Sequence, residues 1–290
     1  MRRGTTETQL LAALSEAPVR YRVLLCDVWG VIHDGAKAFP AACAALAGWR
    51  DTRGPVVLIS NSPRPRDGVI EQLDALGVPR AAWTAIATSG DATRTLLAAR
   101  APGPALKIGP ERDEPLYDGL GLAYSGVEEA SFIACTGLIE DEAETPEDYR
   151  PLLTRAAGRG LAMICANPDI VVQRGPRLIF CAGALAELYG ELGGEAIMAG
   201  KPHAPLYELA LAEASRALGR PADKAETLAI GDGLATDITG ANAQGLDALF
   251  IADGIHAADL FTNGALDPDL VAALLAHHSL HAPFAMPRLV

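Results

Sequence analysis

Short apolar runs that alternate with longer amphipathic stretches constrain the fold of this chain more than any other feature. The runs occupy residues 23–26, 56–59, 132–134, 162–165, 228–230 and 249–251. Strands buried on both faces of a parallel sheet read as continuous apolar runs of this kind. Helical patterns at 40–50, 66–77 and 205–219 lie between runs, so the sequence predicts an α/β fold built from strand–helix–strand units. Glycine stops three amphipathic stretches at the position preferred for a helix C-cap, at Gly77, Gly219 and Gly245.

The middle of the chain interrupts this regular series. Residues 103–194 carry their own strand, turn and helix patterns, and we predict that they form a smaller α/β domain inserted into a parallel-sheet core made of residues 1–102 and 195–290. Within the insertion, segments 105–121 and 140–149 are rich in proline, glycine or charge, which is typical of surface loops.

The composition excludes several classes of protein and partner. Half of the 290 residues are apolar, which supplies a sizeable core, and no apolar run approaches the ~18 residues of a membrane span. The formal net charge of -12 repels nucleic acid and anionic lipid surfaces. The five cysteines lack CxxC spacing and the N-terminus lacks a signal-peptide pattern, which predicts reduced thiols in a cytoplasmic protein. We therefore expect neither nucleic acid nor a membrane as partner.

Polar residues follow three of the apolar runs. Asp27, Ser60 and Asp232 each come just after a run, and the carboxyl ends of parallel strands are where open α/β sheets carry their chemistry. Two further residues complete the set, Lys201 before a helical stretch and Asp237 five residues after Asp232. These residue types suit phosphoryl transfer, because a carboxylate nucleophile needs a cation beside it to cancel its repulsion of the phosphoryl group.

Each of these residues has a predicted role. Asp27 is the predicted nucleophile and, with Asp232 and a backbone carbonyl, the predicted set of Mg²⁺ ligands. Asp237 is predicted to hold metal-bound water or to orient Lys201, and Lys201 to bridge the nucleophile and a phosphoryl oxygen. Ser60 and the following loop, with Asn61, are predicted to bind the other phosphoryl oxygens. The alternatives are ordinary: turn residues, a solvated lysine and a helix-start carboxylate.

The order and spacing of four motifs resemble the haloacid dehalogenase (HAD) superfamily. The motifs are DVWGV from Asp27, LISNS around Ser60, AGKP around Lys201 and GDGLATD around Asp232, and the resemblance spans about residues 22–254. It implies a Rossmann-like core, an α/β cap, an aspartyl-phosphate on Asp27 and a Mg²⁺ requirement.

The long insertion between the second and third motifs looks like the type IIA cap of the nitrophenylphosphatase-like (NagD-type) branch. Asn167 and Asp169 lie in this insertion on either side of Pro168. The sequence leaves two readings of them open, a substrate-facing role and a turn that ends a strand.

One position departs from the family pattern. Family phosphatases usually carry a second Asp, the general acid and base, two residues after the nucleophile, and this chain has Trp29 there. Because indole does not exchange protons near neutral pH, help worth ~10²- to 10⁴-fold is missing. The metal site is kept, since the resemblance assigns only the backbone carbonyl of Trp29 to Mg²⁺. The predicted substitute is His33 or Asp34, on the loop that follows, or proton transfer to the leaving group through solvent.

Three functions follow from these residues. The first is a Mg²⁺-dependent phosphohydrolase that acts on a small phosphorylated metabolite of the sugar phosphate or nucleotide class. The second is a phosphate-binding or regulatory protein weakened by Trp29, and the third is a slow phosphotransferase in which the aspartyl-phosphate persists. A homo-oligomer is compatible with all three.

Overall fold

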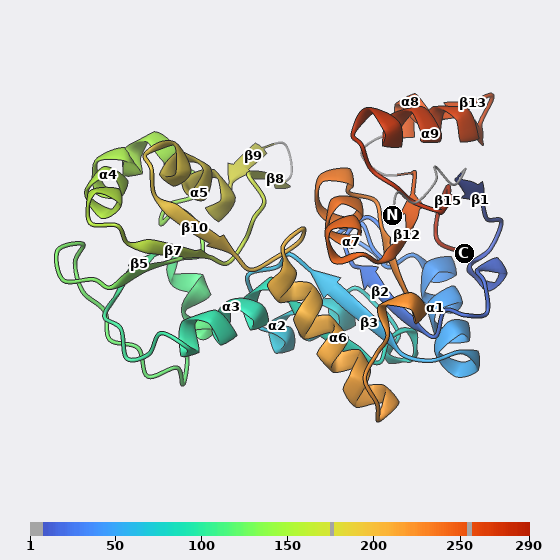
Figure 1. The fold of residues 1–290 in the computed structure, drawn as a ribbon, viewed down its shortest axis with the longest axis horizontal. Coiled ribbons are helices and arrows are strands. Elements are labelled where there is room, and N and C mark those ends of the chain that lie inside the picture. Colours follow the sequence, from blue (N-terminus) through green and yellow to red (C-terminus); the bar gives the residue numbers. More distant parts are fainter. Residues whose placement is uncertain (1–7, 175–176, 254–256) are drawn as a thin grey trace. The chain divides into compact units, whose positions relative to one another are not determined.

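The computed structural model describes residues 8–174, 177–253 and 257–290, and the chain divides into two compact units (Figure 1). The first unit comprises Met1–Ser60, Ile70–Ala87 and Tyr207–Val290, and the second comprises Asn61–Val69 and Thr88–Leu206.

A seven-stranded sheet forms the centre of the first unit. In spatial order its strands are β1 (Gln9–Leu10), β15 (Phe284–Met286), β12 (Asp247–Ile251), β11 (Thr227–Gly231), β2 (Val23–Asp27), β3 (Val56–Ser60) and β4 (Ala85–Thr88). The pairs from β1 through β3 are parallel. The four predicted runs of this unit are β2, β3, β11 and β12, so the predicted α/β class with a parallel sheet is confirmed.

Strand β2 occupies the position that organises the site. All five of its residues are buried, and it lies between β3, which follows it in the chain, and β11, which comes far later. Asp27 is paired in register with Ile59 of β3, and Cys26 is paired with Ile230 of β11. The carboxyl ends of the three strands therefore meet where the strand order reverses, which is the usual place for chemistry in such sheets.

Helices and short turns connect these strands. Glycines with positive φ follow α2 (Arg66–Ala75), α6 (Ala204–Leu218) and α7 (Thr239–Gln244), as predicted, at Gly77, Gly219 and Gly245. The left-handed conformation is easiest there without a side chain. The other α-helices of the first unit are α1 (Pro40–Thr52), α8 (Ala257–Leu260) and α9 (Pro268–His277). The shorter elements are 3-10 turns η1 (Leu14–Glu16), η2 (Arg80–Ala82) and η5 (Lys224–Glu226), the π-helical turn η6 (Leu234–Ile238), and strands β13 (Phe261–Thr262) and β14 (Ala265–Leu266).

The second unit contains a parallel sheet of its own. Its strands, in spatial order, are β10 (Glu195–Met198), β7 (Ala162–Cys165), β6 (Phe132–Cys135) and β5 (Ala105–Ile108). Its helices and turns are α3 (Ser89–Ala98), η3 (Glu111–Leu116), η4 (Pro146–Tyr149), α4 (Arg150–Gly158) and α5 (Ala182–Glu191). Strand β8 (Val171–Arg174) pairs antiparallel with β9 (Arg177–Phe180).

Alternate residues of this second sheet pack on opposite faces. Ile133 and Cys135 belong to one apolar cluster, together with residues of α4 and α5. Phe132 and Ala134 belong to another, together with Leu97 of α3. Because the side-chain period of a strand is two residues, burial on both faces makes the whole strand apolar, and this is why its sequence is a continuous run.

The second sheet extends beyond the predicted insertion of residues 103–194. Strand β10 (Glu195–Met198) pairs with β7, although the sequence prediction assigned it to the core. Strand β5 (Ala105–Ile108) lies in a segment predicted as a surface loop, and that prediction was wrong for these four residues. Both are edge strands of the sheet, and edges tolerate polar residues such as Lys107 and Glu195 that break an apolar pattern.

All five cysteines of the chain are buried and none forms a disulfide. Burial raises the pKa of the Cys43, Cys135 and Cys165 thiols, which keeps them protonated and unreactive. Within the described residues, no helix combines the length and the apolar character needed to cross a bilayer.

Candidate active site

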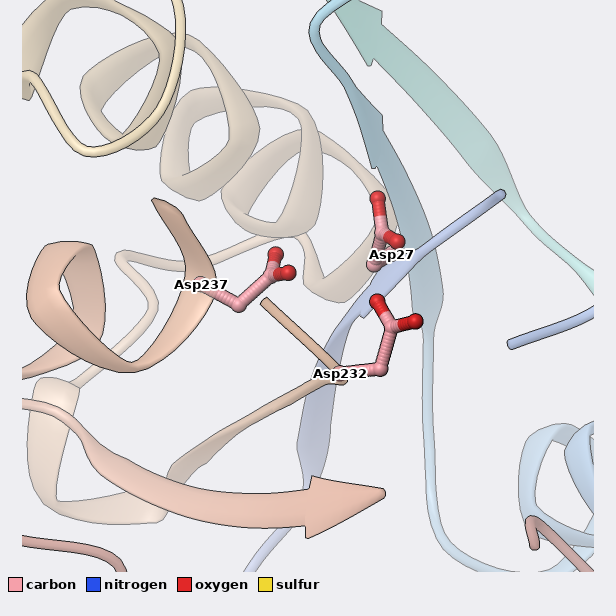
Figure 2. Close-up of side chains that lie close together, drawn as sticks. All are labelled: Asp27, Asp232 and Asp237. Atoms are coloured by element: carbon pink, nitrogen blue, oxygen red, sulfur yellow. The ribbon is translucent and has the colours of Figure 1, made fainter. Parts of the chain in front are cut away.

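Three carboxylates from separate segments converge at the carboxyl edge of the first sheet. Asp27 ends β2, Asp232 follows β11 and Asp237 lies on η6 (Figure 2). Each offers a carboxylate oxygen, and these atoms lie within 4.8 Å of one another. In the part of the chain that the structure describes, no other group of three His, Cys, Asp or Glu side chains gathers in this way.

Glycines make room for these carboxylates. A Cβ atom on Gly231 would lie 2.2 Å from Cγ of Asp237, and one on Gly30, whose φ is +80°, would lie 2.4 Å from Oδ2 of Asp232. Both distances are far below van der Waals contact, so the carboxylates take the space that a side chain would need. The site therefore depends on the absence of side chains directly beside it.

Local hydrogen bonds hold Asp237 in place. The N–H of Gly233 donates to its Oδ2 at 3.1 Å, and the Thr236 hydroxyl donates to the same oxygen at 3.4 Å. The N–H groups of Asp237 and Ile238 both donate to the carbonyl of Gly233, in the wide turn of η6. The Tyr207 hydroxyl donates to the backbone carbonyl of Asp237 at 3.3 Å. Wide helical turns of this type occur often at functional sites.

The donor set fits a hard divalent cation. Asp27 and Asp237 are only 6% and 3% exposed, so their mutual repulsion is poorly screened by water. A cation with a preference for oxygen ligands offsets this repulsion, and carboxylates are the ligands that Mg²⁺ favours. Asp232, which is half-buried and follows β11, completes the cluster.

Ser60 is at the same sheet edge as Asp27. It is the last residue of β3, and its neighbour Ile59 is the register partner of Asp27. The structure thus brings Ser60, Asp27 and the residues after β11 to one edge, as the sequence predicted from the ends of the runs. Its predicted contact with a phosphoryl oxygen stays a prediction.

In the second unit, the Asn61 amide joins two distant segments. Its Oδ1 accepts the N–H of Lys201 at 2.7 Å, while its Nδ2 donates to the Lys201 carbonyl at 3.2 Å and to Oδ1 of Asp169 at 3.1 Å. These bonds use both N–H groups and the oxygen of the amide. The contacts support a positioning role for Asn61, whereas the sequence prediction gave it phosphate binding.

A tight turn follows β7 in the same unit. The side-chain oxygen of Asn167, which is buried, accepts the N–H of Asp169 at 3.0 Å, a geometry that favours a turn. The carbonyl of Asp169 accepts the N–H of Gly183 at 3.2 Å. The turn reading of this segment is therefore supported by its contacts, while the substrate-facing role of Asn167 and Asp169 stays a prediction. Lys201, their predicted partner in binding phosphate, is 3% exposed.

Trp29 lies on a loop that folds back on itself. The N–H of Gly30 donates to the carbonyl of His33 at 2.9 Å, and the indole meets the His33 ring edge-to-face at a centroid distance of 5.3 Å. A Cβ on Gly35 would lie 2.2 Å from the indole. Trp29 is nevertheless 57% exposed, so Gly35 and His33 contact one part of the indole while much of its surface lies in solvent.

The two predicted substitutes for the missing acid have local structural partners. The Asp34 carboxylate accepts the N–H groups of Ala36 and Lys37, each at 2.9 Å, and these bonds lower its pKa. Nδ1 of His33 accepts the N–H of Gly35 at 3.0 Å, and burial lowers the pKa of this imidazole. Near neutral pH, Asp34 is therefore an ionised turn residue and His33 a neutral ring with one nitrogen already bonded. Their role in proton transfer stays a prediction.

The sequence prediction missed the glycines that support the site, and it gave Asn61 phosphate binding instead of a positioning role. Gly30, Gly231 and Gly233 border the carboxylates, and Asn61 positions the Lys201 segment. The available signal was the pair of glycines that flanks Asp232, because paired glycines around a functional carboxylate indicate a close approach of neighbouring groups. Nothing in the sequence pattern indicates the partners of Asn61.

Substitution of Gly231 tests the space around Asp237. We expect Gly231→Ala to lower turnover about 10²-fold, because a displaced carboxylate loses the geometry that catalysis needs. The measurement is the steady-state rate with a phosphomonoester. Gly48→Ala on α1 is the matched control, since a Cβ there meets nothing within 4 Å, and it should change stability by no more than about 1 kcal/mol. Equal rates in both variants would contradict the prediction.

Two family models match the chain. One, described as haloacid dehalogenase-like hydrolase, matches residues 24–123 and includes Asp27 and Ser60. The other, described as HAD-hydrolase-like, matches residues 198–277 and includes Lys201, Asp232 and Asp237. The residues predicted from the four motifs thus all fall within matched segments.

Three relatives illustrate the similarity. A solved hydrolase of the haloacid dehalogenase-like family from Brucella suis 1330 is 47% identical, with a TM-score of 0.81 over 96% of this chain and 99% of that chain. The 5'-nucleotidase YutF of Bacillus subtilis is 26% identical over 250 residues, which are 86% of this chain and 93% of that protein. The p-nitrophenyl phosphatase of Archaeoglobus fulgidus shares the fold, with 20% identity and a TM-score of 0.71 over 91% of this chain and 95% of that chain.

Proposed function

The chain belongs to the haloacid dehalogenase-like hydrolase family, and on this premise we propose that it is a Mg²⁺-dependent phosphatase that hydrolyses a small phosphomonoester through an aspartyl-phosphate on Asp27. The observation that carries the proposal is the cluster of Asp27, Asp232 and Asp237 at the carboxyl edge of the first sheet. Two of the relatives, a 5'-nucleotidase and a p-nitrophenyl phosphatase, are phosphatases by name, which supports the same reaction class.

The proposed reaction consists of two displacement steps at phosphorus. A carboxylate oxygen of Asp27 attacks phosphorus, the bond from phosphorus to the leaving oxygen breaks, and that oxygen takes a proton from solvent or from the predicted substitutes His33 and Asp34 as the alcohol departs. Water then attacks the aspartyl-phosphate, which releases inorganic phosphate and restores the Asp27 carboxylate. Bound at Asp27, Asp232 and the backbone carbonyl of Trp29, a Mg²⁺ ion would neutralise charge on the phosphoryl oxygens.

Other residues have supporting roles in this proposal. Asp237, held by Gly233 and Thr236, orients groups around the cation. Ser60, at the end of β3, donates a hydrogen bond to a phosphoryl oxygen. Lys201 supplies a positive charge to the phosphoryl oxygens, which is the role predicted for it from the order of the motifs.

The substrate is a small phosphorylated metabolite, and the two classes predicted from the sequence are sugar phosphates and nucleotides. The name of the Bacillus subtilis relative supports the nucleotide class. The nitrophenylphosphatase-like branch is supported by the likeness of fold to the Archaeoglobus fulgidus enzyme.

A phosphate-release screen tests the proposal against its rivals. The protein is incubated with Mg²⁺ and a panel of phosphomonoesters, and inorganic phosphate is followed over time. Steady release supports the phosphatase. A burst of the leaving alcohol that stops at one per protein, with the phosphoryl group retained on the chain and no further release of inorganic phosphate, supports the slow phosphotransferase. Binding without release of either product supports the regulatory protein. These rivals are retained because Trp29 replaces the usual acid.

Removal of one carboxylate tests the cation site without the need for turnover. We expect Mg²⁺ to raise the melting temperature of the wild-type protein by mass action, since it binds the folded state. The same Mg²⁺ concentration should have a much smaller effect on Asp232→Asn, which loses a charged ligand. Differential scanning calorimetry over a Mg²⁺ series measures both effects. The control is Asp51→Asn, because the side chain of Asp51 on α1 is 67% exposed. An unchanged Mg²⁺ response in Asp232→Asn would exclude this residue as a ligand.

A further inference from the structure

Trp29 differs from the other two tryptophans of the chain in its exposure. Trp49 and Trp83 are 3% and 8% exposed and belong to the core, whereas Trp29 is 57% exposed. Leaving a large aromatic side chain in water sacrifices the free energy that its burial would provide. An indole that the fold holds in solvent is therefore available to a partner outside the chain.

The surroundings of Trp29 fix the orientation of its ring. The six-membered part of the indole covers Gly35, where a Cβ would approach it to 2.2 Å, and His33 meets the ring edge-to-face with an interplanar angle of 79°. His33 is itself buried and accepts the Gly35 N–H. A ring held by these two contacts, which are themselves joined by the His33–Gly35 hydrogen bond, loses little conformational freedom when a ligand binds, which favours binding.

The position of Trp29 is beside the carboxylate cluster. Trp29 is two residues after Asp27, and the next residue, Gly30, abuts the Asp232 carboxylate so closely that a Cβ would lie 2.4 Å from Oδ2. The indole is therefore carried by the loop that borders the Asp232 carboxylate. A substrate whose phosphate binds at the cluster would direct its leaving group toward the residues around the cluster, and this loop is among them.

We propose that Trp29 is a specificity-determining residue that stacks on the planar base of a nucleoside leaving group, so that the preferred substrates are nucleoside monophosphates rather than simple sugar phosphates. This inference rests on the proposed function and narrows its substrate class. Indole offers a large uncharged face, and base–aromatic stacking tolerates any base because each has a π-face. The same substitution that removes an acid thus supplies a recognition surface.

Fluorescence provides a test that is independent of turnover. Because Trp49 and Trp83 are buried, Trp29 is the tryptophan that a bound base can quench by contact. The Asp27→Asn protein with Mg²⁺ is titrated with adenosine 5'-monophosphate and with ribose 5-phosphate, which share the phosphate and the sugar and differ in the base. We expect quenching by the nucleotide alone and about tenfold tighter binding of the nucleotide by calorimetry, a typical effect of stacking.

Two variants separate stacking from simple bulk. Trp29→Phe keeps an aromatic face and should retain most of the preference for the nucleotide, whereas Trp29→Leu should lose that preference. The preference is measured as the ratio of ligand affinities in the Asp27→Asn background and as the ratio of KM values in the protein with Asp27 intact. Equal affinity for the two ligands, no binding of either, or an unchanged preference in Trp29→Leu would overturn the proposal. Failure of the phosphatase function is distinguishable, because it removes phosphate release from every ester and leaves quenching by the nucleotide intact.

Discussion

Asp27→Asn should abolish steady phosphate release, with a loss of at least about 10³-fold in kcat. The carboxamide has nearly the shape of the carboxylate but is a far poorer nucleophile, and it is a weaker ligand for a hard cation. The change sits at the end of a fully buried strand, where shape matters most for packing, so an isosteric replacement keeps the fold. Phosphate release under saturating Mg²⁺ and substrate measures the effect.

The same variant should be more stable than the wild type in the absence of divalent cations. It removes one of three carboxylates whose oxygens lie within 4.8 Å, and like charges in a partly dry site destabilise the folded state. Thermal unfolding in chelator measures this second effect. Asp51→Asn, on the exposed face of α1, is the control for removal of a carboxylate elsewhere. Turnover that survives in Asp27→Asn would refute the aspartyl-phosphate mechanism.

Trp29→Asp should accelerate the hydrolysis of esters with poor leaving groups. The new carboxyl group would occupy the position from which family phosphatases protonate the leaving oxygen, and general acid catalysis typically contributes ~10²- to 10⁴-fold. We expect the gain with glycerol phosphate to exceed the gain with p-nitrophenyl phosphate by at least about tenfold. The reason is that p-nitrophenolate departs without a proton, whereas an alkoxide does not.

Trp29→Asn is the matched control for this prediction. It removes the indole and opens the same space without adding a proton donor. The leaving-group dependence of kcat is measured for both variants and for the wild type. If Trp29→Asp and Trp29→Asn behave alike, the proton already comes from another group, and His33 or solvent takes that role.

The sheet could be predicted because its strands are buried on both faces. All of β2 and all but Ser60 of β3 are buried, so hydrophobic burial alone dictates their composition and the runs are unmistakable in the sequence. Strands at the edge of a sheet are under weaker constraint. β5 includes a charged lysine and β10 begins with an exposed glutamate, and for this reason the pattern did not indicate them.

The site was predictable only to the level of residue and sheet edge. The rule that chemistry lies at carboxyl ends of parallel strands was enough to bring Asp27, Ser60 and Asp232 together. It carries no information on close approach, which depends on the three-dimensional path of the chain. The contact of Gly30 with Asp232 and the bonds from Asn61 to Lys201 join segments that are 140 or more residues apart, and no local pattern encodes them.

The burial of every native thiol has a practical consequence for spectroscopy. A maleimide dye reaches surface cysteines, and this chain offers none, so a cysteine introduced at an exposed position is labelled alone without removal of the native five. Asp51 in the first unit has a 67% exposed side chain, and Leu178 in the second is 70% exposed. A dye pair at these two positions turns the separation of the units into an energy-transfer signal that can be followed as phosphate, Mg²⁺ or nucleotide is added.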